Sequence, residues 1–174
     1  YSYDVGTSDW VQKGNSFTSG ISYKLSGDGD MVAITTETSS SSTYGTVKVY
    51  EWDGSSWIQK GNDINGDLLE TTGFGLTTNS LNIKNENGIK LIISEYQRQN
   101  LGRVNIYEWD GTNWVKKLNI DGTQNSQELG YGVDMSRYGE QVVISSALEV
   151  TRVYNITPTI ERTILSMSMN DTSI

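Results

Sequence analysis

Acidic side chains recur in pairs along this chain, and a pair of carboxylates is what most glycoside hydrolases use for catalysis. Glu51 and Asp53 form one pair, and Glu108 and Asp110 form another 57 residues later. A catalytic pair is normally unique in its protein, whereas these pairs repeat. Asp53 and Asp110 also precede Gly, where an Asp commonly caps a turn. We therefore expect no enzyme, and a carboxylate-dependent glycoside hydrolase is the weaker alternative.

The sequence lacks the residues that most other hydrolases and metal sites require. It contains no His and no Cys. A Ser-His-Asp triad, a thiolate nucleophile, an imidazole ligand and a disulfide are therefore excluded. We expect no cofactor.

Tryptophan is the second residue type whose positions suggest a function. Exposed aromatic rings stack on sugars in lectins, so glycan stacking is an alternative for Trp52, Trp57, Trp109 and Trp114. Trp57 and Trp114, like Trp10, each lie seven residues after a recurring Tyr. A residue that packs one repeat on the next would keep the same spacing. Packing is therefore the preferred interpretation.

An internal repeat organises the whole chain. Val49–Gly54 reads V-Y-E-W-D-G and Ile106–Gly111 reads I-Y-E-W-D-G. The motif Tyr recurs at intervals of 47, 57 and 47 residues, at Tyr3, Tyr50, Tyr107 and Tyr154. Residues 1–156 therefore form three repeats. Residues 157–174 form an atypical tail with Glu161 where the motif has Trp, and we expect this tail to be a linker or a strand exchanged with a neighbour.

Each repeat predicts four short strands joined by polar turns. The first strands are expected at Ile21–Ser26, Phe74–Thr78 and Tyr131–Ser136, and the second at Asp30–Thr36, Ile89–Ser94 and Glu140–Ser146. The third are expected at Thr46–Trp52, Arg103–Trp109 and Val150–Ile156, and the fourth at Trp57–Lys60 and Trp114–Lys117. The chain would begin with a third-and-fourth-strand hairpin over Tyr1–Lys13.

Four antiparallel strands that recur every 40–57 residues or so are typical of a propeller blade. We expect an all-β, propeller-like fold of about three four-stranded antiparallel blades, as part of a larger propeller or of an assembly. Closed propellers have about 4–8 blades, so three would leave two open faces. We therefore expect self-association, or contact with missing parent sequence, through these faces.

The succession Gly73-Phe74-Gly75, Leu91–Ser94 and Val104–Trp114 resembles the FG-GAP-type β-propeller repeats, the family that includes the integrin α head. The variety it is most similar to occurs in large surface proteins of microbes, algae and their viruses. The resemblance covers residues 1–156 and implies propeller blades. It also implies a calcium loop, Asp-x-Asp-x-Asp-Gly, between the first two strands. The best match is Ile83–Gly88, whose first position, Ile83, cannot ligate, so we expect no metal site.

Charge and composition limit the partners. The net charge is −8 and no Lys/Arg cluster occurs, which argues against nucleic acid. No apolar run approaches the roughly 20 residues that a membrane helix needs, so we expect no membrane insertion. We expect a non-enzymatic structural or adhesive module of a surface fibre, cell surface or virion. A glycan-binding, lectin-like propeller is the alternative, with carbohydrate as its partner.

Two N-x-T sequences could carry N-linked sugar in a secreted protein. They begin at Asn155 and Asn170. We expect glycosylation at these sites if the chain is secreted by a eukaryotic host.

Overall fold

The computed structural model describes residues 2–18, 20–37, 45–66, 73–75, 80–86, 88–125, 127–147 and 150–156. These residues form strands and turns together with one short 3₁₀ turn, η1 (Arg98–Asn100), which confirms the all-β prediction. Within the same ranges, no helix has the length and hydropathy to span a bilayer.

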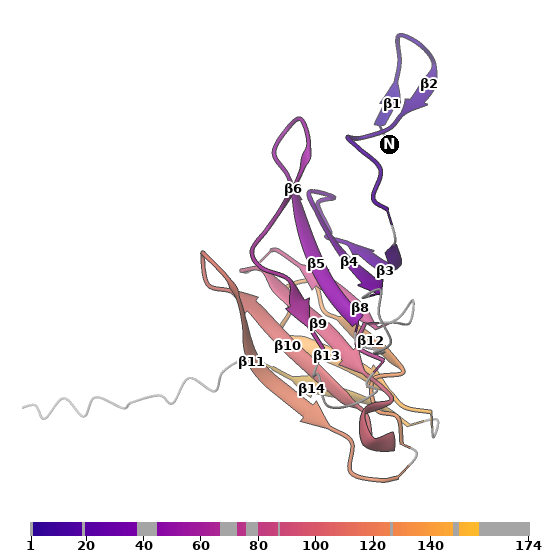
Figure 1. The fold of residues 1–174 in the computed structure, drawn as a ribbon, viewed down its shortest axis with the longest axis vertical. Helices are drawn as coiled ribbons and strands as arrows, with labels where there is room; N and C mark the ends of the chain where they lie inside the picture. The colour runs from indigo at the N-terminus through magenta and orange to yellow at the C-terminus, as the bar shows by residue number, and fades with distance from the viewer. Residues whose placement is uncertain are drawn as a thin grey trace, which may run out of the picture.

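The strands form one hairpin and three antiparallel sheets (Figure 1). The N-terminal hairpin consists of β1 (Ser2–Asp4) and β2 (Asp9–Val11). The first sheet consists of β3 (Gly20–Leu25), β4 (Met31–Glu37), β5 (Gly45–Trp52) and β6 (Trp57–Gln59), and β7 (Ile64–Asn65) also pairs with β5. The middle sheet consists of β8 (Leu81–Lys84), β9 (Lys90–Glu95), β10 (Arg103–Trp109) and β11 (Trp114–Asp121). The last sheet consists of β12 (Gly132–Met135), β13 (Gln141–Ser145) and β14 (Thr151–Asn155).

The repeat appears in the structure as consecutive strands that pair in chain order. Both complete repeats run through four neighbouring strands, as the sequence predicts. In the third repeat three strands are described, and residues 157–174, the predicted tail, lie outside the described residues. The described strands do not form a closed sheet.

The first strand of the second repeat was placed wrongly from the sequence. The prediction was Phe74–Thr78, but the strand that pairs with β9 is β8, and Phe74 makes only an isolated bridge with Glu95. Burial fixes this register, because Leu81 and Ile83 on β8 are both almost fully buried between the sheets. Residues 76–79 lie outside the described residues.

Strands β8, β9 and β10 of the middle sheet are buried on both faces. Alternate side chains of a strand point to opposite faces, so Leu91 and Ile93 of β9 contact the first sheet and Ile92 contacts the last. The cluster between the first and middle sheets contains Met31, Ala33, Val47, Val49, Ile64, Phe74, Leu81, Ile83, Leu91, Ile93 and Tyr107. The cluster between the middle and last sheets contains Ile92, Val104, Ile106, Leu129, Val133, Met135, Val142 and Ile144.

The first strands of the three sheets lie next to one another. β8 lies against β3 and β4, and β12 lies against β8 and β9. The N-terminal hairpin instead projects from the end of the molecule (Figure 1). Its Val5 and Trp10 side chains are 82% and 65% exposed. The stack of three sheets, rather than the hairpin, therefore contains the hydrophobic core.

Truncating a core isoleucine tests this arrangement against a matched exposed isoleucine. Ile83→Ala removes a side chain that is 1% exposed, and Ile58→Ala removes one on β6 that is 53% exposed. We expect Ile83→Ala to lower the free energy of unfolding by about 2–4 kcal/mol, as in other cores, and Ile58→Ala by less than about 1 kcal/mol. Urea denaturation measures both values. Equal losses would contradict the assigned core.

Candidate functional site

A compact joint connects the segment after the N-terminal hairpin to the first sheet. The indole Nε1 of Trp57 donates a 2.9 Å hydrogen bond to the carbonyl oxygen of Lys13. The Trp57 ring meets that of Trp52 edge-on, with 5.3 Å between the centroids, and Lys13 Nζ lies 5.0 Å from the Trp52 ring. Gly14 lies directly against the same rings.

The same joint recurs between the first sheet and the middle sheet. Trp114 Nε1 donates a 2.9 Å hydrogen bond to the carbonyl oxygen of Lys60. Lys60 Nζ lies 4.8 Å from the ring of Trp109, and the Trp109 and Trp114 centroids are 5.5 Å apart. In both joints, the Lys-Gly pair that ends one repeat contacts two tryptophans of the next.

The hydrogen bond, the cation over the ring and the close glycine each contribute to the stability of a joint. The indole N–H groups are already satisfied, a contribution of about 1 kcal/mol each. A cation over an aromatic ring adds roughly 0.5–1 kcal/mol at a partly exposed site. A Cβ at Gly61 would lie 2.6 Å from the Trp109 ring, so only glycine allows this approach. The four tryptophans considered for glycan stacking therefore pack against each other in pairs and against a Lys-Gly pair of the same chain.

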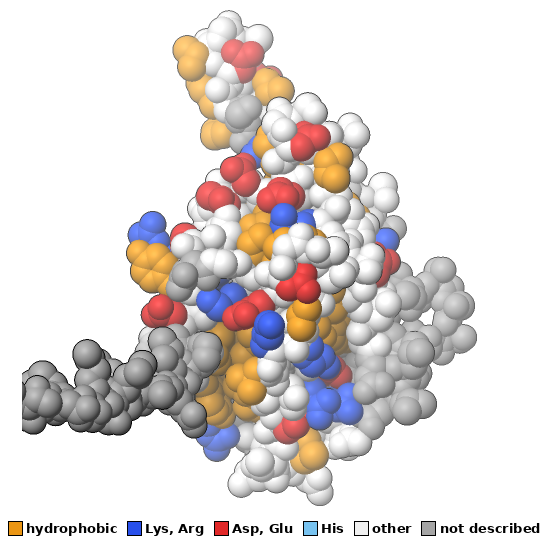
Figure 2. Space-filling model, turned by 90° about the vertical axis from the view of Figure 1, so that its left-hand side faces the viewer, with side chains coloured by type: hydrophobic (Ala, Val, Ile, Leu, Met, Phe, Trp, Pro, Cys, Tyr) orange, Lys and Arg blue, Asp and Glu red, His pale blue; other side chains and the backbone are white. Residues whose placement is uncertain are grey.

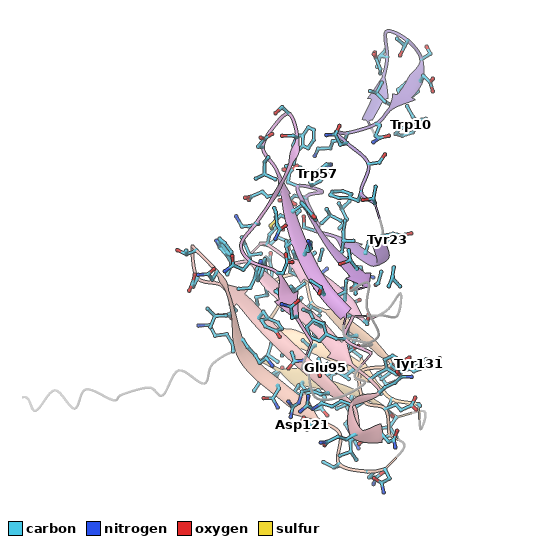
Figure 3. All side chains as sticks on the ribbon, viewed as in Figure 1. Trp10, Tyr23, Trp57, Glu95, Asp121 and Tyr131 are labelled. Carbon is cyan, nitrogen blue, oxygen red and sulfur yellow. The ribbon has the colours of Figure 1, made fainter. Side chains whose placement is uncertain are left out.

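Trp10 is placed differently from its counterparts in the repeat. It packs edge-on against Tyr3 in the projecting hairpin, with 5.5 Å between the ring centroids (Figure 3). Trp57 lies lower, on the first sheet. The regular spacing of the three tryptophans thus leads to two joints and one exposed ring among the described residues.

The repeated aspartates hold turns. Asp53 Oδ1 accepts 2.7 Å hydrogen bonds from the backbone N–H groups of Ser55 and Ser56. Asp110 Oδ1 accepts 2.8 Å bonds from Thr112 and Asn113 in the same way. The backbone N–H bonds, first from Ser56 and then from Ser55, lower the pKa of Asp53 to about 2. The equivalent bonds from Asn113 and Thr112 lower the pKa of Asp110.

The repeated glutamates lie one residue before the Trp of the motif. Glu51 Oε2 forms a 2.7 Å ion pair with Lys60 Nζ, and Glu108 lies opposite Val115 on the neighbouring strand. The structure thus gives Asp53 and Asp110 turn contacts and Glu51 an ion pair. Among the described residues no three acidic side chains gather as a metal site would require.

A groove lies beside the second joint, next to Lys60, Gly61 and Trp109. It has a volume of about 410 Å³ and is lined by Glu51, Trp52, Asp53, Ile58, Gln59, Lys60, Gly61 and Trp109. On the face that Figure 2 draws, hydrophobic side chains reach the surface among Lys, Arg, Asp and Glu. An aromatic wall with nearby carboxylates and an amide has the chemistry of a sugar-binding surface.

The best candidate for a calcium loop lies in a row of hairpin turns. Asn85 Nδ2 donates to Asp28 Oδ2 in the turn of the first sheet. Glu86 Oε1 lies 3.4 Å from Arg137 Nε in the turn of the last sheet. These side chains tie neighbouring sheets together at the turns. Ile83, the first residue of the predicted loop, is buried in the core.

The first glycosylation candidate lies on the exposed strand β14. The Oδ1 atom of Asn155 accepts a 3.0 Å hydrogen bond from Gln141 Nε2. The second candidate, Asn170, lies outside the described residues.

Two features went unnoticed in the sequence. The Lys-Gly pairs that follow Trp10 and Trp57 were visible as a repeat, but their contact partners were not. Glu95 is 2% exposed, with Asn105 Nδ2 donating to Oε1 and Arg98 Nη1 3.3 Å from Oε2. Burial raises the pKa of Tyr107, and the nearby Glu95 carboxylate raises it further. Nothing in the local sequence distinguishes Glu95 from a surface acid.

Comparison with protein-family models finds no match to this chain, and comparison with curated proteins finds none either.

Adding a methyl group at a joint glycine tests the close packing against a matched turn glycine. Gly61 (φ +77°) contacts Trp109, whereas Gly54 (φ +104°) has nothing within 4 Å of an added Cβ. We expect Gly54→Ala to cost about 1–2 kcal/mol for the left-handed backbone alone, and Gly61→Ala roughly 2–4 kcal/mol because it also displaces the ring. Urea denaturation gives both values. If the two losses were equal, the rings would not be closely packed.

Acid titration tests the turn role of Asp53. The pKa of Asp53 is lower in the folded chain than its ordinary value of 3.8. Its contribution to stability is therefore present above pH 4 or so and is lost as the pH falls toward about 2. Carboxyl-detected NMR should give a midpoint near 2 for Asp53, and Asp53→Asn should weaken the pH dependence of unfolding in this window. A midpoint near 3.8 would mean that the turn hydrogen bonds are absent.

Proposed function

We propose that this chain is a non-enzymatic structural or adhesive module, displayed outside the cell or on a virion, whose sheets are propeller-like blades of the FG-GAP type. The observation that carries the proposal is the joint. The same contact, an indole N–H on the carbonyl of a lysine in the preceding repeat, occurs twice at 2.9 Å. Residues that recur with the repeat thus serve the connection of one repeat to the next.

The arrangement of the acids supports a role without catalysis. Asp53 and Asp110 are engaged by backbone N–H groups of their own turns, and Glu51 is paired with Lys60. A catalytic acid needs a raised pKa to hold its proton near neutral pH, whereas the pKa values of both aspartates are lowered.

The contacts among the sheets support the blade interpretation. Each sheet follows the chain from strand to neighbouring strand, and the first strands lie side by side. A sheet in such a stack needs two packing faces, and the middle sheet has them. Display on a surface agrees with the net charge of −8 and with sequons at Asn155 and Asn170.

Glycan binding is the second candidate, and the groove beside Trp109 is the observation that favours it. Trp109 is only partly buried and shares the groove with Glu51, Asp53 and Gln59. A sugar stacked on this ring would use these polar atoms for orientation.

One substitution separates the two functions. Trp109→Ala removes a joint ring, and Trp10→Ala removes a ring that is 65% exposed in the hairpin. If Trp109 is a packing residue, Trp109→Ala lowers the free energy of unfolding by roughly 2–4 kcal/mol, whereas Trp10→Ala costs less than about 1 kcal/mol.

Urea denaturation and a glycan array on the same proteins provide the measurement. Glycan binding by the original chain that Trp109→Ala abolishes without loss of stability would establish the second function instead. Turnover of a glycoside substrate would overturn the non-enzymatic proposal.

A further inference from the structure

Strand pairing makes certain positions of the three sheets equivalent. Tyr23 pairs with Ile34 in the first sheet, as Leu81 pairs with Ile93 and Val133 with Ile144. Leu25, Ile83 and Met135 occupy the next equivalent position, opposite Val32, Leu91 and Val142. These residues lie on the face of each sheet that points toward the preceding repeat.

The equivalent positions differ in exposure. Leu81 and Ile83 are 0% and 1% exposed beneath the first sheet, and Val133 and Met135 are 6% and 5% exposed beneath the middle sheet. Their counterparts Tyr23 and Leu25 are 71% and 57% exposed. Tyr23 lies on the edge strand β3 (Figure 3). On the neighbouring strand β4, Val32 and Ile34 of the same face are buried, at 8% and 4%, and Phe17 lines a groove with Ile34. At the edge strand β3, an apolar face that is covered twice in this chain is thus left exposed. We call it the outer face of the first sheet.

The opposite end of the stack shows the complementary opening. Val49, Ile106 and Val153 are equivalent by pairing, and their exposed fractions are 1%, 2% and 67%. Val143, Ser145, Thr151 and Val153 of the last sheet form the same kind of small, mostly β-branched surface that Ile92, Ser94, Val104 and Ile106 form on the middle sheet. We call it the outer face of the last sheet.

We propose that a second copy of this chain covers the outer face of the first sheet with the outer face of its own last sheet. The contact repeats, between two chains, the interface that already occurs twice within one. This proposal rests on the proposed structural function and identifies a second copy of the chain as the partner of the module. Because the two faces are unlike, the contact is heterologous, and it extends into a filament or closes into a ring.

The joint at the first sheet is compatible with this partner. Trp52 and Trp57 already hold Lys13 and Gly14 of their own chain. The partner's last sheet must therefore have no fourth strand that would occupy the position of Lys13 and Gly14 against these two rings. The described strands of the last sheet are β12, β13 and β14, and none of these three occupies the fourth-strand position.

Mixed disulfide cross-linking tests the contact, since the chain has no native Cys. Within the chain, Leu81 shares a core cluster with Ala33, and Val133 shares one with Ile92. The corresponding pair between copies is Tyr23 with Val143, because Val143 is equivalent to Ala33 and Ile92. Full-length Tyr23→Cys and Val143→Cys chains are mixed in equal amounts and oxidised mildly. The control mixture contains Leu118→Cys in place of Val143→Cys. Leu118 lies on β11, is 42% exposed, and belongs to neither the outer face of the first sheet nor that of the last sheet.

We expect covalent dimers from the Tyr23→Cys and Val143→Cys mixture, at several times the yield of either variant alone or of the control mixture. Light scattering of the original chain should show a mass that rises with concentration, and Tyr23→Glu should return it to a monomer. A monomer at every concentration, or cross-linking no better than the control, would overturn the proposal. Dimers from Tyr23→Cys alone would overturn its head-to-tail form. None of these three results would affect the proposed function, because the comparison of Trp109→Ala with Trp10→Ala can be made on a monomer.

Discussion

The structure depends on the burial of apolar side chains between neighbouring sheets, which covers both faces of the middle sheet. A four-stranded sheet with Leu, Ile and Val on both sides cannot leave either side in water without losing about 1.5–3 kcal/mol for each large side chain. The middle sheet meets this requirement, because Leu91 and Ile93 pack on one neighbour and Ile92 on the other. Each end sheet packs on one neighbour only, so the two ends of the stack are more exposed than its centre.

Within the described part of the chain, polar contacts connect the stacked sheets at three places. Lys60 and Gly61 of the first sheet fit against two tryptophans of the middle sheet, and the Lys60 carbonyl accepts an indole hydrogen bond. At the hairpin turns, Asn85 contacts Asp28 and Glu86 contacts Arg137. Between the first strands, Asn82 of β8 donates to Asp134 of β12. Hydrophobic packing alone would tolerate a sheet that slides on its neighbour, whereas these directional contacts select one register.

The sequence predicts those features that are encoded locally. Asp-Gly turns and alternating β-branched residues place β5, β10 and β13 to within a residue or so, because turn chemistry and burial period act over only a few positions. Features that depend on distant partners were missed or misplaced. The sequence predicted that the first strand of the second repeat begins at Phe74, but β8 begins seven residues later, because contact with the first sheet sets its register. The partners of Lys13 and Lys60, and the burial of Glu95, likewise depend on residues far along the chain or on another strand.

Amide hydrogen exchange on the folded chain tests the central claim most directly. If burial on both faces stabilises the stack, the amides of β9 and β10 in the middle sheet should exchange only through global unfolding and show the highest protection in the protein. The amides of β1 and β2, in the projecting hairpin, should exchange through local opening with a much smaller free energy. Protection of the hairpin equal to that of β9, or a middle sheet that exchanges faster than the first and last sheets, would contradict the account.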